Sequence, residues 1–182
     1  KNRVRKYGAH GTSHQFVAGK GAKLAGLDIN NSKIITCHIG NGSSITAIVN
    51  GKSVDTSMGF TPLDGVIMGT RCGSIDPNVV PYLMKKENLT PDEMTEIMNK
   101  KSGFLGISGA SSDARDLDAL ANSGDQRAKL ALKMLTYGII KYIGSYAAVM
   151  NGVDLIIFTG GIGEHNSRLR RRVCENFSYL GL

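Results

Sequence analysis

The sequence predicts an α/β domain with a mixed sheet, in which a three-stranded antiparallel meander is followed by flanking helices and a further strand. Two observations carry this prediction. Residues 33–57 form three β-rich runs joined by short turns, and residues 126–150 form a long helix with an apolar face before a short apolar strand. Strands that come first and helices that cross afterwards are typical of α/β layer architectures.

The meander is predicted from three adjoining runs of strand-forming residues. Residues 34–39 form a first strand that stops at a Gly-Asn-Gly turn, and residues 43–49 follow as a second. An Asn-Gly pair at residues 50–51 is the strongest short hairpin pattern, and it leads into a third strand at residues 52–57.

Capping patterns place the shorter helices. A first helix is expected at residues 14–27, where apolar residues recur with helical spacing. Asp76 can cap a second helix with Pro77 at its first position. Thr90 and Glu93 form a capping box that opens a third helix.

A long helix and a strand are expected towards the end of the chain. Ser123 and Gln126 form a second capping box that opens the helix. Apolar residues then recur at three- and four-residue steps, which predicts a face turned to the core. These residues are Ala128, Leu132, Leu135, Ile139, Ile143, Ala147 and Met150. The strand follows at residues 154–159, and a glycine turn leads into a last helix from about Glu164.

Composition narrows the classes of function. The net charge is +7, but no aromatic residues interleave the basic runs and no nucleic-acid-binding module accompanies them, so we expect no nucleic-acid partner. Three cysteines without CxxC spacing favour a reducing, cytoplasmic location over a disulfide framework or a zinc site. No apolar run is long enough to span a bilayer, so we expect no membrane partner. The opening KNRVRKYGAHG, without an initiator Met, suggests a chain cut from a longer one.

Two glycine-rich junctions are candidate sites for an anion. Residues 38–42 (HIGNG) form a turn between strands, where backbone N–H groups can converge on phosphate oxygens because no Cβ blocks their approach. Residues 158–164 (FTGGIGE) join a strand to a helix, and a helix N-terminus favours anionic groups. A plain tight turn and close strand–helix packing are the structural alternatives, and they stay open.

Three further loops carry polar side chains. Arg71 lies between glycines, where its forked guanidinium either meets a carboxylate or phosphate or ties the loop. His10 and His14 flank a helix start, where they could pair on a metal ion but lack a nearby third ligand. Residues 111–116 form a polar loop before a helix, for which helix capping is the alternative.

Together and in this order, these segments resemble one family, the acetate kinases, in the superfamily of sugar kinases, actin and Hsp70. The matching segments are YGAHGTSH, HIGNGSSI, DTSMGFTPLDGVIMGTRCGSIDP, GISGASSDARDL and FTGGIGEHNSRLR. The resemblance covers essentially the whole chain and implies a ribonuclease-H-like domain. Because the family's chain is longer at both ends, residues 1–32 would be a helical segment joining from a missing amino-terminal domain. Residues 33–182 would be a nucleotide-binding carboxyl-terminal domain that is incomplete at its end.

The resemblance also implies an activity: reversible transfer of the γ-phosphoryl group of ATP to acetate, giving acetyl phosphate and ADP. By similarity, His10 and Arg71 are catalytic residues that stabilise the charge of the transferring group. Three segments would bind the nucleotide, the first through its phosphates and the other two around the adenosine. They are His38, Ile39, Gly40, Asn41 and Gly42; Asp113, Ala114 and Arg115; and Gly161, Ile162, Gly163, Glu164 and His165.

By the same resemblance, the cofactor is ATP or ADP with Mg²⁺, and the protein ligands of the Mg²⁺ lie outside this chain. The resemblance also implies that the acceptor is acetate or a similar short carboxylate and that the enzyme is a homodimer. The chain departs from the family's usual residues at Ala9, Ser74, Ala114 and His165, none of which removes a charge donor. Two alternatives stay open: a propionate or butyrate kinase, and a non-catalytic nucleotide-binding module.

Overall fold

The structure, a computed structural model, describes residues 2–181, and these fall into two compact units. The first unit contains the residues up to 65 together with those from 136 onward, and the second contains residues 66–135. The sequence did not indicate this division. The domain boundary expected at residue 32 stays a prediction.

The first unit is built on a four-stranded mixed sheet with the order β3-β2-β1-β4. Its strands are β1 (Lys33–Ile39), β2 (Ser43–Val49), β3 (Lys52–Thr56) and β4 (Leu155–Thr159). The first three pair antiparallel in sequence, and β4 pairs parallel with β1. The predicted meander is confirmed. Asn50 and Gly51 both have positive φ, of 52° and 75°, as a two-residue turn of the I′ type requires.

One face of this sheet changes from apolar to polar along the strands. Ile34 lies opposite Ile48 on β2, Thr36 lies opposite Thr46, and His38 lies opposite Ser44. Side chains directly opposite each other in an antiparallel pair share a face. This face is therefore apolar where β1 begins and carries hydroxyls and an imidazole where β1 ends.

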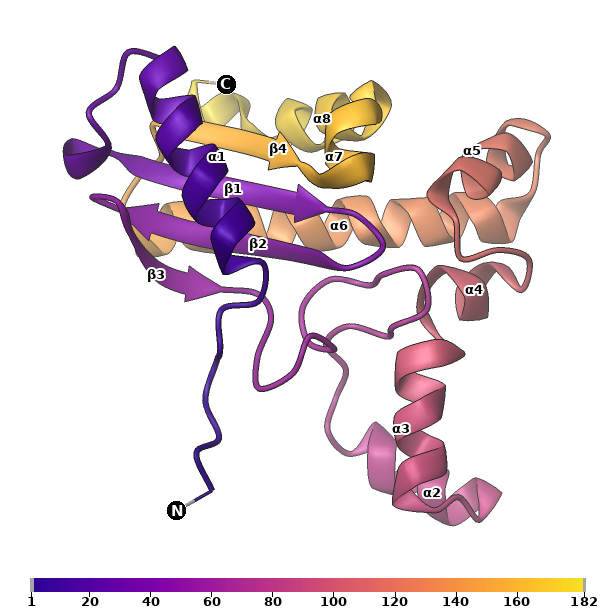
Figure 1. The fold of residues 1–182 in the computed structure, drawn as a ribbon. Helices are drawn as coiled ribbons and strands as arrows, with labels where there is room; N and C mark the ends of the chain where they lie inside the picture. The colour runs from indigo at the N-terminus through magenta and orange to yellow at the C-terminus, as the bar shows by residue number, and fades with distance from the viewer. Residues whose placement is uncertain (1, 182) are drawn as a thin grey trace. The chain divides into compact units, whose positions relative to one another are not determined.

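Helix α1 (Gly11–Leu24) covers this graded face (Figure 1). Its buried residues are His14, Ala18 and Ala22, spaced four apart as one helical stripe. The two alanines pack with the isoleucines at the apolar end of the face. His14 consequently meets the polar end. The helix predicted at residues 14–27 is present, beginning and ending three residues earlier.

Helix α6 (Gln126–Val149) supplies the predicted apolar face. All seven residues expected to face the core are buried, six of them in the helix and Met150 directly after it. Within the first unit, residues 136–149 of α6 lie on the side of the sheet opposite α1 (Figure 1). The predicted capping box was wrong at its first position. The carboxylate of Asp125 accepts a hydrogen bond from the Ala128 N–H at 2.7 Å, and Ser123 instead ends the preceding helix.

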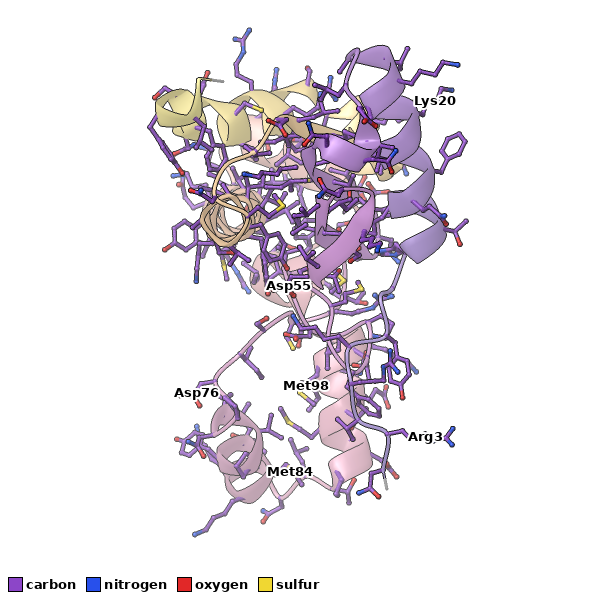
Figure 2. All side chains as sticks on the ribbon, turned by 90° about the vertical axis from the view of Figure 1, so that its left-hand side faces the viewer. Arg3, Lys20, Asp55, Asp76, Met84 and Met98 are labelled. Carbon is purple, nitrogen blue, oxygen red and sulfur yellow. The ribbon has the colours of Figure 1, made fainter. Side chains whose placement is uncertain are left out.

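The second unit contains α2 (Val79–Glu87), α3 (Pro91–Lys100), α4 (Gly103–Ser108) and α5 (Ala114–Asn122). The capping box of Thr90 and Glu93 is confirmed, with hydrogen bonds in both directions. Helix α2 packs on α3, and Figure 2 shows Met84 and Met98 between them. Helix α2 begins two residues later than the sequence predicted, because the Asp76 carboxylate accepts from the Asn78 N–H in a turn before the helix.

The glycine stretch after β4 is helical, which corrects the predicted turn. Helix α7 (Gly160–His165) starts directly at the strand end and contacts β1 and β4. Gly160 has φ 77°, and a Cβ there would lie 2.7 Å from the Ile39 carbonyl oxygen, so only glycine fits this junction. Asn166 then caps α8 (Ser167–Cys174), which is followed by η2 (Glu175–Leu180). A short η1 (Ile29–Asn31) precedes β1. Between residues 2 and 181, no helix has the length and apolar character needed to cross a membrane.

Candidate active site

Most of the predicted site residues of the first unit lie together at one edge of the sheet, at the carboxyl ends of β1 and β4. His38 near the end of β1 is in register with Thr159 at the end of β4. The turn at residues 40–42 follows β1, and α7 follows β4. His10, at the start of α1, stacks on His38. Ligands of open α/β sheets bind outside the carboxyl ends of parallel strands, and this edge is therefore the candidate site.

His10 holds a strained backbone conformation. Its φ of 60° and ψ of 20° lie in the left-handed region, which few residues other than glycine adopt. The turn that holds it is closed by a hydrogen bond from the Gly11 N–H to the Gly8 carbonyl at 3.1 Å. A conformation of this kind costs about 1–3 kcal/mol and persists mainly where the surrounding fold imposes it, often at functional sites.

Three imidazoles cluster at the polar end of the sheet face. The rings of His10 and His38 are stacked, with centroids 4.1 Å apart and planes 18° apart, and His14 lies just over 6 Å from each. The sequence left a histidine metal pair open, and folding brings in the third histidine that it lacked. Yet no group of three or more His, Cys, Asp or Glu residues among residues 2–181 is arranged to hold a metal ion.

Each histidine of the cluster is instead hydrogen-bonded to a hydroxyl. His10 Nδ1 and His14 Nε2 both bond to Ser44 Oγ, at 2.8 and 2.7 Å. His14 Nδ1 bonds to Thr36 Oγ1 at 2.7 Å, and His38 Nδ1 bonds to the hydroxyl of Ser13 at 2.9 Å.

Burial keeps the inner histidines neutral. The pKa of His14 is lowered to about 4. Loss of water around the ring is the largest cause, and the nearby His38 and His10 add to it. Burial also lowers the pKa of His38. Near neutral pH each of these two rings therefore carries a single N–H group.

The predicted phosphate-binding residues in the turn after β1 differ in whether a ligand can reach them. Ile39 is fully buried in the core, and the Gly40 N–H donates to the Gly42 carbonyl at 3.1 Å, which closes the turn on itself. Asn41 at the tip is exposed, and among residues 2–181 its side chain has no hydrogen-bond partner. Asn41 and the backbone of Gly42 are thus the parts of this turn that can meet a ligand.

Helix α7 likewise separates exposed from buried positions. Gly161 is exposed, and a Cβ added there would meet no atom within 4 Å. Gly163 is buried, and a Cβ added there would lie 3.5 Å from the Cys37 carbonyl oxygen and from the Ile39 side chain, so this glycine packs the helix on β1. Ile162 is half-buried, and Glu164 and His165 are exposed.

In the second unit, Arg71 is half-buried in a loop that α3 and α4 hold in place. The Met68 N–H donates to the Arg71 carbonyl at 3.1 Å, which makes a tight turn. The Phe104 N–H at the start of α4 donates to the Met68 carbonyl, and the Cys72 N–H donates to the Met98 carbonyl at the end of α3. The guanidinium also contacts the Met68 sulfur. The arginine is thus carried by a loop with a fixed backbone.

The segment of Asp113, Ala114 and Arg115 adopts the capping arrangement that the sequence left open. Asp113 accepts from the Arg115 N–H at 2.8 Å and caps α5. The Arg115 guanidinium bonds to the same carboxylate at 2.6 Å, which lowers the pKa of Asp113 to about 2. The side chain of Ala114 is buried. The part that this segment plays in nucleotide binding stays a prediction.

The family profile that matches this chain is that of the acetokinase family, over residues 1–182. The chain belongs to the acetokinase family. It is 58% identical to an acetate kinase of Heliobacterium modesticaldum over 182 residues, which is 100% of this chain and 46% of that protein. The chain therefore spans about half the length of the curated relative it matches.

Solved structures of an acetate kinase and of a propionate kinase share this fold. A crystal structure of Porphyromonas gingivalis acetate kinase matches with a TM-score of 0.97 and 49% identity, over 98% of this chain and 45% of that one. A propionate kinase from Francisella tularensis matches with a TM-score of 0.91 and 45% identity, over 97% of this chain and 45% of that one. The fold class predicted from the sequence is confirmed.

Within this acetokinase-family chain, sequence reasoning missed the hydroxyls that hold the histidines. Thr36 is an ordinary member of a β-rich run and Ser13 a residue near a helix start, while Ser43 or Ser44 was expected to offer a hydroxyl to a phosphate beside the glycine turn. The pattern that could have found them is the alternation of β1 and β2, because Thr36, His38, Ser44 and Thr46 fall on a single face once the two strands are paired.

Proposed function

We propose that the protein containing this chain is an acetate kinase, which transfers the γ-phosphoryl group of ATP to acetate reversibly and gives acetyl phosphate and ADP. In this reaction the bond between the γ-phosphorus and the bridging oxygen of ADP breaks as a bond to the carboxylate oxygen forms. Membership of the acetokinase family supports the reaction class. The observation in this chain that supports it most is His10, whose backbone is strained and whose imidazole is held at the carboxyl ends of parallel strands.

His10 and Arg71 are the proposed catalytic residues. Phosphoryl transfer depends on positioning and on neutralising charge spread over the transferring oxygens. A ring N–H from His10 and the forked N–H groups of Arg71 are donors suited to such oxygens. Both side chains are carried by backbone that hydrogen bonds hold on each side.

The nucleotide is proposed to bind with its phosphates at the 40–42 turn. The exposed amide of Asn41 and the backbone of Gly42 fit a phosphate group, since no Cβ crowds the glycine. Gly161, the second residue of α7, has space beside it, which fits close approach of the adenosine end. Mg²⁺ would supply charge neutralisation between the phosphates, and its ligands are proposed to lie outside this chain.

Two further features of the whole protein follow by resemblance to the family: a homodimeric assembly and a cytoplasmic location. Free cysteines at positions 37, 72 and 174 agree with a reducing compartment. Light scattering of the complete natural protein, and its fractionation from cells, test these two proposals.

An acceptor comparison tests the proposed substrate. The complete natural protein is assayed with ATP and acetate, propionate or butyrate, and the acyl phosphate is trapped as its hydroxamate. We expect the highest kcat/KM with acetate. A higher kcat/KM with propionate would assign the protein to the propionate kinases, an alternative that the likeness to the Francisella tularensis structure favours. Nucleotide binding without any acyl phosphate would instead favour the non-catalytic module.

A further inference from the structure

A buried chain of hydrogen bonds leads from the sheet to His10. It runs from Thr36 Oγ1 to His14 Nδ1, from His14 Nε2 to Ser44 Oγ, and from Ser44 Oγ to His10 Nδ1, with lengths of 2.7, 2.7 and 2.8 Å. Thr36, His14 and Ser44 have exposed fractions of 0, 4 and 0%. Water therefore does not replace any inner partner of the chain, and every link has to be satisfied by the protein.

The number of protons available to these hydrogen bonds couples the tautomer of His14 to that of His10. A hydroxyl has one proton to donate, and a neutral imidazole has one N–H donor and one acceptor nitrogen. Ser44 lies between two ring nitrogens, so it donates to one and accepts from the other. Because His14 is neutral, it also donates on one side and accepts on the other. All bonds must consequently point in the same direction along the chain.

Thr36 selects between the two possible directions. Its hydroxyl bonds only to His14 among residues 2–181. If His14 donated to Thr36, the threonine proton would be buried without an acceptor, and an unsatisfied buried donor costs about 1–3 kcal/mol. Thr36 therefore donates to His14 Nδ1, His14 Nε2–H donates to Ser44, and the Ser44 hydroxyl donates to His10 Nδ1.

Among residues 2–181, no fixed charge is among the groups that shift the pKa of His14. The titratable groups that act on His14 are His38 on β1 and His10 at the start of α1. The residues of β2 and β4 on the same face, Thr46 and Ile157 among them, are uncharged. The stacked His38 ring, anchored by Ser13, restrains His10 from the side, while Ser44 restrains it within its ring plane.

We propose that Thr36, His14 and Ser44 are positioning residues, which orient the His10 ring and hold it as the neutral tautomer with its proton on Nε2. That N–H is then the donor that His10 presents to the transferring phosphoryl group. This step rests on the proposed phosphoryl transfer, whereas the tautomer itself is a property of the folded protein.

Imidazole-nitrogen NMR and steady-state kinetics on the complete natural protein test the proposal. Wild type should show His10 protonated on Nε2 alone near neutral pH. Ser44→Ala and Thr36→Val should give a mixture of His10 tautomers and a kcat at least about tenfold lower, with the KM for ATP within about twofold. Thr36→Ser keeps the donor and should restore both readouts.

Thr46→Val is the matched control. It removes a buried hydroxyl that lies on the same sheet face and bonds to Thr56. This hydroxyl is not part of the hydrogen-bond chain that leads to His10. It should leave the tautomer and kcat at wild-type values, whatever its effect on stability.

Two results would overturn the proposal: a wild-type His10 with Nδ1 protonated, or Ser44→Ala and Thr36→Val spectra that keep a single Nε2–H tautomer. Thr36→Val is close to isosteric, so it supplies the comparison even where Ser44→Ala does not fold. If the wild type shows the expected tautomer but no phosphoryl transfer to any short carboxylate, the proposed function fails and the positioning chain stands.

Discussion

Arg71 is carried by a loop whose backbone is tied to α3 and α4, so its side chain can be changed with little effect on the fold. Arg71→Ala should lower kcat by about 10²–10³, the typical loss for one donor to a developing charge, while ATP affinity changes little. Arg71→Lys should recover part of the loss, because it keeps the charge without the fork. Steady-state kinetics of the complete natural protein make this comparison.

An arginine elsewhere on the surface controls for the change in net charge. Arg171, on α8, is exposed and lies outside the proposed site. Arg171→Ala should leave kcat unchanged. If Arg71→Ala also keeps the wild-type kcat, then the guanidinium only ties its loop.

His14 should make stability depend on pH. The unfolded chain protonates this residue near its ordinary pKa of 6.5, whereas the folded protein resists protonation until about pH 4. Stability therefore falls as pH decreases from 6.5 to 4, by up to about 3 kcal/mol from this group. Burial of His38 acts in the same direction.

Urea unfolding at several pH values between 7.5 and 4.5 measures this dependence. His14→Gln removes the titrating group, and its stability relative to its own value at pH 7.5 should fall less steeply than that of the wild type. Equal slopes for the two proteins would show that His14 is not held neutral.

At the residue scale, the sequence could indicate His10, His38 and Arg71 because their residue types and glycine-rich settings suit phosphate chemistry. It could not indicate Ser44 and Thr36, because their role depends on strand register and on the docking of α1. Nor could it separate Gly161, which is exposed, from Gly163, which packs on β1.

At the element scale, the start of α4 fixes the backbone that carries Arg71. Gly103 has φ 59°, and a Cβ there would lie 2.1 Å from the Met68 carbonyl oxygen and 2.7 Å from that of Arg71. Gly103→Ala must therefore displace the arginine loop. We expect it to lower both the melting temperature and kcat.

Gly124→Ala is the matched control for Gly103→Ala. Gly124 also has a positive φ, of 108°, but a Cβ there would meet no atom within 4 Å. The Gly124→Ala variant should lose only the stability that a positive φ costs an alanine, as measured by thermal unfolding. Its kcat should stay at the wild-type value. If the two variants lose the same stability and activity, the Gly103 contact with the arginine loop has no special role.

Elements with strong local patterns were predicted well. The capping box of α3, the Asn-Gly hairpin and the apolar stripe of α6 are all encoded by neighbouring residues. The sequence misplaced α7, because four residues with three glycines favour a turn until packing on β1 and β4 stabilises the helix. Pro81 does not interrupt α2, because it is the third helical residue, where a backbone N–H has no intrahelical partner.

At the scale of the whole molecule, the division into two units could not be read from the sequence. No linker marks it, and one boundary falls within α6. The division reflects contacts between residues far apart in the chain, which neither composition nor periodicity records.

The isolated 182-residue chain should bind ADP more weakly than the complete natural protein and make no acetyl phosphate. The chain spans about half the length of its curated relatives. The Mg²⁺ ligands are proposed to lie outside it. A nucleotide that contacts part of a site buries less of its surface and stays open to water. Calorimetry with ADP and a hydroxamate assay measure the two properties. Turnover by the isolated chain would contradict this assignment of the catalytic groups.

The most direct test of the proposed function compares wild type and His10→Ala in the complete natural protein. Acetyl phosphate formed from ATP and acetate is trapped as the hydroxamate, and ATP binding is measured in parallel by calorimetry. We predict acetyl hydroxamate with the wild type and a kcat about 10²–10³ lower with His10→Ala, at nearly unchanged ATP affinity. A wild-type kcat in His10→Ala would contradict the catalytic role of this residue, and a folded, ATP-binding wild type that makes no acyl phosphate would contradict the kinase itself.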